Sequence, residues 1–199
     1  MSTRFFAPVA ALAAMLALAG PALAARDHVR VEGKTRTIFG STSPVVDGGA
    51  NALTALDAAS AAGEFYYHVT PTGFGPYIDQ VGRFAAGGSS GWVFKVDGVS
   101  PPVGADSVQL KDGDTVLWYW ADFGPNGGPP TLELRRAGRC YSVTAQDDNG
   151  KTTPATGAIL HVGSRRTVTT SAGRACVRPH PGLLVRATMD GAVRSNALP

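Results

Sequence analysis

Residues 91–98 read GWVFKVDG and residues 110–116 read LKDGDTV, and together they predict the centre of a small sheet. The segment Trp92–Val96 has the aromatic and β-branched residues of a strand, and Asp97-Gly98 after it is favoured in tight hairpin turns. In the second stretch, Asp112-Gly113-Asp114 is a turn, and Thr115–Trp120 is expected to close the sheet as a further strand.

One short helix is expected ahead of these strands. Asn51 is a good N-cap, Leu53 and Leu56 lie at helical spacing, and Gly63 ends the pattern. Strands are predicted at His28–Gly33, at its hairpin partner Thr35–Phe39 and at Phe65–Val69. One helix on a small mixed sheet is a β-grasp-like α+β arrangement, which we predict for residues 25–122.

The strongest break in the chain is residues 123–130, FGPNGGPP, which neither a helix nor a strand can cross. We therefore predict a Gly/Pro linker at 123–130 between two domains, 25–122 and 131–199. The charge differs on the two sides of the break. Residues 26–122 carry 7 basic and 11 acidic side chains, net −4, whereas residues 123–199 carry 10 basic and 4 acidic, net +6. The overall net charge of +3 is therefore the sum of an acidic first half, a basic second half and Arg4.

The segment after the break has short alternating runs separated by turn residues, which is typical of a small all-β sandwich. The expected strands are Thr131–Arg135, Cys140–Ala145, Ile159–Val162, Arg166–Thr170, Arg174–Arg178, Leu183–Thr188 and Ala192–Arg194.

The first 24 residues have the layout of a secretory signal peptide. Arg4 gives a positive start, Phe5–Leu18 is an uncharged apolar run, and Ala22-Leu23-Ala24 is a small-x-small cleavage site. The run is short for a membrane span, and no other segment approaches 18 apolar residues, so we expect a secreted, extracellular protein with no membrane span. In that oxidising compartment the two cysteines, Cys140 and Cys176, are expected to form a disulfide. A metal site or a free catalytic thiol is the weaker alternative, because no histidine has ligand-like spacing to either cysteine.

The first half resembles the transcobalamin-like C-terminal domain family, a domain family of unknown function of the soluble-ligand-binding β-grasp type. The resemblance spans about Val29–Trp120. The segments that carry it are residues 91–98, 103–105 and 110–116, with residues 52–58 on the helix and 75–81 before the Trp92 strand. It implies an extracellular binding domain. In this family the domain closes over cobalamin held by a large helical domain, for which this chain has no room. We therefore expect no cofactor, with a corrinoid as the one candidate that the resemblance raises, and we transfer no cobalamin-contact residue.

The second half is similar to bacterial immunoglobulin-like or carboxypeptidase-regulatory-like modules. The matching residues are 155–162 and 169–175. Such modules are commonly spacers or adhesion units, which is what the resemblance implies for this half.

No catalytic motif is visible in the sequence. It has no nucleophile elbow, zinc-protease motif or phosphate loop, and the four histidines are isolated, so we predict no catalytic residue and no metal site. Asp112 and Asp114 flank a turn glycine, where a hairpin role is expected. The candidate ligand-binding residues are aromatic, because an exposed aromatic row stacks on sugars or planar molecules. They are Tyr66, Tyr67, Trp92, Trp118 and Trp120, with Trp92 expected in the core and one of Trp118 and Tyr119 expected to face outward.

These observations leave two functions open. The first is a monomeric, non-enzymatic binding protein that takes a small molecule or a surface partner through its β-grasp domain. The alternative is a structural or adhesive cell-surface protein whose arginine-rich second half docks on anionic wall polymers. The opposing interpretation of the arginines is a scatter over several faces, since alternation along strands separates them. Nucleic-acid binding has no motif support.

Overall fold

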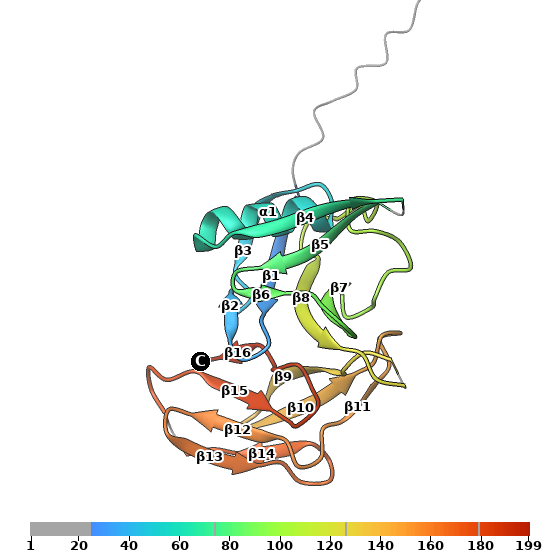
Figure 1. Ribbon diagram of the computed structural model, residues 1–199. Helices are drawn as coiled ribbons and strands as arrows, with labels where there is room; N and C mark the ends of the chain where they lie inside the picture. The colour runs from blue at the N-terminus through green and yellow to red at the C-terminus, as the bar shows by residue number, and fades with distance from the viewer. Residues whose placement is uncertain (1–24, 74, 126, 179) are drawn as a thin grey trace, which may run out of the picture.

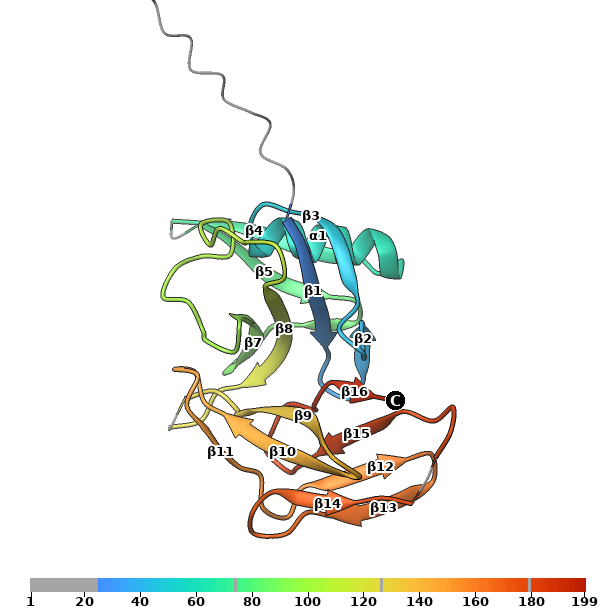
Figure 2. The same ribbon diagram turned by 180° about the vertical axis from the view of Figure 1, so that it is seen from behind.

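Figures 1 and 2 show the computed structural model of the chain from opposite sides; it describes residues 25–73, 75–125, 127–178 and 180–199. The predicted signal peptide at residues 1–24 lies outside the described residues. The described residues form mostly β-structure with one short helix, which confirms the predicted α+β class. The mixed sheet and its helix come first in the chain, and antiparallel sheets follow.

The mixed sheet of the first half is built around a central parallel pair. Its strands are β1 (Ala25–Glu32), β2 (Thr37–Phe39), β3 (Val45–Gly49), β7 (Ser90–Val96) and β8 (Thr115–Asp122). Strands β1 and β8 run parallel, β2 and β3 pair with β1, and β7 pairs with β8, all three antiparallel. The hairpin partner predicted at Thr35–Phe39 is therefore present as β2, whereas β3 was not predicted.

Helix α1 (Ala52–Gly63) covers one face of this sheet, as Figure 1 shows. Asn51 caps it as predicted: its side chain accepts a hydrogen bond from the Thr54 amide, and the Thr54 hydroxyl accepts one from the Asn51 amide. The helix buries Ala52, Ala55, Leu56 and Ala59. These small side chains let the helix lie close to the sheet, in one core with Val29, Val31, Val116 and Trp118.

A small antiparallel sheet flanks the helix and consists of β4 (Tyr67–Thr72), β5 (Gly75–Val81) and β6 (Phe84–Ala85). Strand β4 begins two residues later than the predicted strand at Phe65. The reason is the end of the helix, where Glu64 takes a left-handed conformation and the Phe65 amide still bonds to the Ser60 carbonyl.

The two turns predicted from sequence hold the sheet in register. Asp97 and Gly98 both have positive φ, 49° and 83°, as a type I′ turn requires. The Asp97 side chain accepts a hydrogen bond from the Thr115 amide. Asp112 accepts one from the Arg26 amide and Asp114 one from the Lys111 amide, so both carboxylates support backbone geometry.

The second half consists of two antiparallel sheets. One contains β9 (Thr131–Ala137), β10 (Cys140–Gln146), β11 (Thr152–Pro154) and β14 (Arg174–Cys176), and the other β12 (Ile159–Val162), β13 (Arg165–Val168), β15 (Val185–Thr188) and β16 (Ala197–Leu198). A common core that includes Leu134, Tyr141, Leu160 and Val185 lies between them. Cys140 and Cys176 face each other across β10 and β14 and form the predicted disulfide.

Several strand predictions in this half differ from the structure. Strands β13 and β14 end at Val168 and Cys176, two residues before the predicted ends at Thr170 and Arg178. Leu183 and Leu184 are exposed and precede β15, which begins at Val185. Residues Ala192–Arg194 form no regular strand. Instead, Val193 donates to the Pro130 carbonyl and accepts from the Leu132 amide, so this segment is held to the start of β9 by a single parallel bridge.

The second half covers the face of the mixed sheet that α1 leaves free. Along β8, Val116 and Trp118 belong to the helix-side core, whereas Leu117, Tyr119 and Ala121 form a second cluster with Val193. The expectation that one of Trp118 and Tyr119 faces outward is therefore wrong. They do point to opposite faces, but both faces are covered, and they are 2% and 1% exposed.

The helix of the described residues is too short and insufficiently apolar to cross a membrane.

Candidate functional site

An aromatic cleft with a volume of about 340 Å³ opens beside the mixed sheet. Strand β5 supplies Pro76, Tyr77 and Ile78, and strand β7 supplies Trp92, Val93 and Phe94. The remaining wall comes from β8, from the loop after β7 and from residues at the border of the second half. These residues are Trp118, Tyr119, Ser100, Pro101, Gly104, Ala105, Phe123 and Asp148. We call this feature the aromatic cleft.

Pairs of aromatic side chains across β7 and β8 build the back wall of the cleft. Phe94 lies directly opposite Trp118 in the strand register, and the two rings stack with centroids 4.9 Å apart. Trp92 lies opposite Trp120, and their rings meet edge to face at 5.9 Å. Such pairs hold their rings in fixed orientations and thereby preform the apolar surface.

The polar ends of the two lining indoles are occupied inside the core. Trp118 donates from Nε1 to the Ala52 carbonyl at 3.1 Å, and Trp92 donates from Nε1 to the Phe84 carbonyl at 2.8 Å. The indole N–H groups are thus unavailable to a molecule in the cleft, and both buried rings support its wall from behind.

The polar groups of the cleft gather around Asp148. The Asp148 carboxylate accepts a hydrogen bond from the Ser100 hydroxyl at 3.2 Å and a long one from the Tyr119 hydroxyl at 3.5 Å. Burial, and then the negative charge of Asp148, raise the pKa of Tyr119, so its hydroxyl stays protonated and acts as a donor. The cleft therefore combines apolar walls with one half-exposed carboxylate from the β10–β11 turn.

Exposed apolar side chains mark the mouth. Tyr77 and Phe123 line the cleft and are 40% and 42% exposed. Val99 and Val103, in the loop that contributes Ser100 and Pro101, are also exposed. Exposed apolar side chains gathered at a concave surface are typical of interaction sites.

The structure brings together two of the five predicted aromatic residues. Trp92 and Trp118 both line the cleft, and Trp92 is buried in the core as expected. Tyr66 is 59% exposed and lies elsewhere, where its hydroxyl accepts a hydrogen bond from Gln80. Tyr67 donates to Asp57 on α1, and burial raises its pKa. Trp120 packs on Trp92 and Phe84 outside the cleft lining. A ligand-binding role stays a prediction for each of them.

The sequence reasoning missed Tyr77, Phe94 and Phe123. For Phe94 a signal was available, because it stands two residues after Trp92 on a strand and must share its face. Tyr77 and Phe123 reach the cleft from the small sheet and from the Gly/Pro segment, and strand periodicity places neither of them there. Among the described residues, no group of three or more His, Cys, Asp or Glu side chains is arranged to hold a metal.

The comparison with curated proteins finds no match to this chain. A family model does match residues 49–122, a range that holds α1, β4–β8 and most of the cleft lining, whereas Phe123 and Asp148 lie outside it. Residues 49–122 are thus similar to the family described as Domain of unknown function (DUF4430).

Proposed function

We propose that the chain is an exported, non-enzymatic binding protein that holds a small ligand in the aromatic cleft. The observation that carries the proposal is an apolar cleft of about 340 Å³ whose exposed rings, Tyr77 and Phe123, and half-buried Phe94 are backed by the buried Trp92 and Trp118. This volume is in the range of sites for small organic ligands. The disulfide between Cys140 and Cys176 is consistent with an extracellular location.

The lining determines the class of ligand. Ring surfaces and proline favour a planar molecule or the apolar face of a sugar, since both stack on aromatic side chains. Asp148 adds an acceptor at one side, so a ligand with hydroxyl or amino groups along one edge suits the cleft best. The resemblance to transcobalamin-like domains makes a corrinoid a further candidate to be tested.

A direct test is a ligand screen by thermal shift and by intrinsic tryptophan fluorescence. The probes are planar heteroaromatic compounds, mono- and oligosaccharides, and corrinoids. Binding in the cleft is expected to raise the melting temperature and to change the emission, because two of the three tryptophans line it. The small-ligand proposal is dropped if none of the three classes shifts either signal.

Variants at the mouth localise any binding that is found. Tyr77→Ala and Phe123→Ala remove exposed rings without opening the core, and each is expected to weaken binding roughly ten-fold. Tyr66→Ala is the matched control, because Tyr66 is an exposed tyrosine that lies outside the cleft. Equal loss of affinity in the control variant would place the site elsewhere.

A second function is favoured by two arginines and a histidine that lie side by side on strands β12, β13 and β15. His161 stands opposite Arg166 on β13 and opposite Arg186 on β15, so the three side chains project from one face of the sheet. Burial, and then the charges of Arg166 and Arg186, lower the pKa of His161. The positive charge therefore comes from Arg166 and Arg186, which form no ion pair with a carboxylate of the described residues and support docking on an anionic polymer.

The polymer proposal is tested by sedimentation with cell-wall material. The full chain is expected to pellet at low salt and to be released at high salt, because screening weakens such contacts. Replacing Arg166 and Arg186 by Gln should abolish pelleting, whereas Arg139→Gln, an exposed turn arginine, should leave most of it. If the double variant pellets as well as the native chain, these arginines do not form the docking surface.

A further inference from the structure

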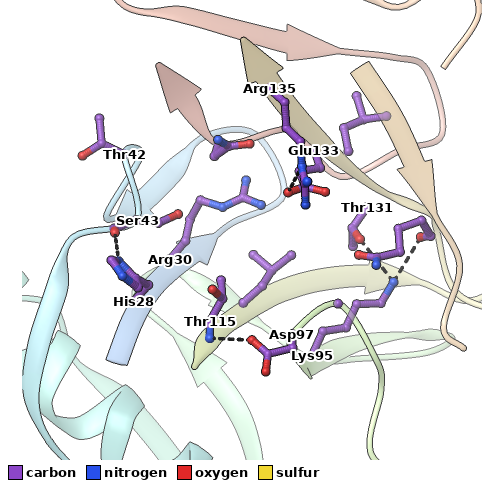
Figure 3. Close-up of a pocket in the computed structure, with 15 residues that line it drawn as sticks. His28, Arg30, Thr42, Ser43, Lys95, Asp97, Thr115, Thr131, Glu133 and Arg135 are labelled. Carbon is purple, nitrogen blue, oxygen red and sulfur yellow. Dashed lines mark hydrogen bonds and ion pairs between the residues drawn. The ribbon is translucent and has the colours of Figure 1, made fainter. Parts of the chain in front are cut away.

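A second and larger cavity lies where the two halves meet. Its volume is about 510 Å³, and it lies between the face of the mixed sheet opposite α1 and the strands β9 and β10. Figure 3 shows Arg30 and Lys95 reaching into it from the first half, with Glu133 and Arg135 across from them. It shares no lining residue with the aromatic cleft.

Arg30 lines this cavity and makes fewer hydrogen bonds than its guanidinium can donate. The residue is only 6% exposed, and its guanidinium points into the space in Figure 3. Its Nη1 donates to Glu32 at 3.2 Å and to the Arg194 carbonyl at 2.7 Å. Its Nε and Nη2 have no hydrogen-bond partner within the described part of the chain. These two nitrogens form the side edge of the guanidinium, whose two parallel N–H bonds fit a carboxylate.

The charge around Arg30 is incompletely balanced. The buried Glu32 carboxylate is shared between Arg30 and Arg194, which approaches it at 3.0 Å, so two cations share one anion. Burial lowers the pKa of Arg30, and the positive charges of Arg186 and Arg194 lower it further. The negative charge of Glu32 raises it but does not cancel the effect of burial. A buried cation in excess is costly, and an anion in the cavity would relieve that cost.

The other charged groups of the cavity lining already have partners. The Lys95 ammonium has three donors and three acceptors: the Thr131 hydroxyl and the carbonyls of Gln146 and Asp147. Glu133 is paired with Arg135 at 2.8 Å, and Asp97 accepts from the Thr115 amide. Further donors without a partner among the described residues are the hydroxyls of Thr42, Ser43 and Thr115.

We propose that this cavity binds a small polar carboxylate, whose two oxygens accept hydrogen bonds from Nε and Nη2 of Arg30. One free guanidinium edge and one surplus charge match a monoanion. A phosphate or sulfate dianion fits less well, because Glu133 and Asp97 also line the cavity and would repel the second charge. The volume of about 510 Å³ suits a small metabolite and leaves room for hydroxyl or amino groups near Thr42, Ser43 and Thr115.

The test uses nuclear magnetic resonance of the arginine side chains in the full exported chain, which reports on the proposed contact without any substitution. Acetate, glycolate and glycine are the carboxylate probes, each titrated to about 50 mM at constant ionic strength, a range that captures weak binding. One buried arginine Nε–H resonance, that of Arg30, is expected to shift and saturate. Phosphate and sulfate are the comparison anions and are expected to shift it less.

Variants then connect the signal to the site. Arg30→Lys keeps the charge but removes the fork, so the dissociation constant is expected to rise roughly ten-fold. Arg139→Lys is the matched control and should leave it unchanged, because Arg139 lies in an exposed turn. The proposal is overturned if no arginine Nε–H resonance saturates with any carboxylate, or if phosphate and sulfate act equally well. If Arg30→Lys does not fold, assignment of the Nε–H resonance from the native backbone still decides the question.

Discussion

The carboxylate of Asp27 lies in an unusual position on β1. The residue is fully buried, and neither of its oxygens has a hydrogen-bond partner within the described residues. Burial, and then the negative charges of Asp114 and Asp112, raise its pKa to about 6. Since a free aspartate titrates near 3.9, the folded protein holds this proton more tightly than the unfolded chain does.

This difference in pKa predicts a pH-dependent stability. The stabilising contribution of protonated Asp27 is complete below about pH 4 and is lost as the pH rises through about 6. Well above pH 6 the ionised carboxylate in the folded protein lowers the free energy of unfolding by about 3 kcal/mol relative to pH 4. Asp27→Asn has nearly the same shape and no charge. In urea unfolding, the variant is expected to be more stable than the native chain by up to that amount at pH 8 and about equal to it at pH 4.

The control for Asp27 is Asp47→Asn, which changes an exposed carboxylate paired with Arg26 on the neighbouring strand. Its effect should stay within about 0.5 kcal/mol. A constant difference between Asp27→Asn and the native chain across this pH range would contradict the assignment.

Glu32 is a buried carboxylate that joins the two halves of the molecule. Both of its oxygens accept a hydrogen bond from Thr37, and they also contact Arg30 and Arg194. Glu32→Gln would leave the buried Arg30 and the half-buried Arg194 without their anion, and the free energy of unfolding is expected to fall by about 3–5 kcal/mol. Urea unfolding measures this, with Glu64→Gln at the exposed helix end as control. A loss below 1 kcal/mol, on the order of an exposed pair, would show that this network contributes little.

At the scale of elements, the disulfide between β10 and β14 closes a long loop. The two cysteines are 36 residues apart, and closing such a loop removes about 4 kcal/mol of unfolded-state entropy in the chain-entropy model. Replacing both cysteines by Ser is expected to lower the free energy of unfolding by about 2–4 kcal/mol. Guanidinium unfolding monitored by circular dichroism measures the change. Equal stability of the native chain with and without reductant would argue against this role.

The elements with local signals were predictable from the sequence. The Asn51 cap, the Asp97-Gly98 turn and the strands β7, β8 and β10 depend on interactions within a few residues, which the sequence displays directly. Strands β3, β6, β11 and β16 were missed because they are short edge segments, and the pairing of β3 and β16 is set by distant partners. Ala197, for example, donates its amide to the Ser41 carbonyl. Strand β5 was missed as well, because it begins with the turn residues Gly75 and Pro76.

The candidate site was predictable only in part, and for a related reason. Trp92 and Trp118 could be identified because strand alternation and cross-strand pairing are local rules. Phe123 and Asp148 reach the cleft because the second half folds back against the first. The residues next to them in the sequence carry no pattern that predicts this contact. The excess positive charge at Arg30 also depends on Arg194, which is 164 residues away.

At the scale of the whole molecule, the two halves are joined by more than the Gly/Pro segment. Lys95 of the first half is completely buried and donates to two carbonyls of the second. Leu117, Tyr119 and Ala121 form an apolar cluster with Val193. The sequence predicts domains at 25–122 and 131–199, but each half leaves an apolar or charged face that only the other half covers.

This mutual dependence predicts one cooperative unfolding transition for the full chain. All three tryptophans, Trp92, Trp118 and Trp120, belong to the first half, so their emission reports on it. Amide hydrogen exchange of β10 and β12 reports on the second. Because removing either half would expose the cluster of Leu117 and Tyr119 and leave Lys95 without its acceptors, both probes should give the same free energy of unfolding.

A fragment of residues 25–122 provides the sharpest version of this prediction. It keeps α1, the mixed sheet and the aromatic pairs, but exposes Tyr119 and Leu117 and breaks the contacts of Glu32 with Arg194 and of Lys95 with residues 131–147. We expect its urea midpoint to fall well below that of the full chain and its exposed face to bind a hydrophobic dye. Adding residues 123–199 in trans should partly restore the midpoint, because the buried charges regain their partners. If the fragment alone unfolds at the same midpoint as the full chain, the halves are independent domains. The contacts between them, including those around the cavity lined by Arg30, then do not contribute to stability.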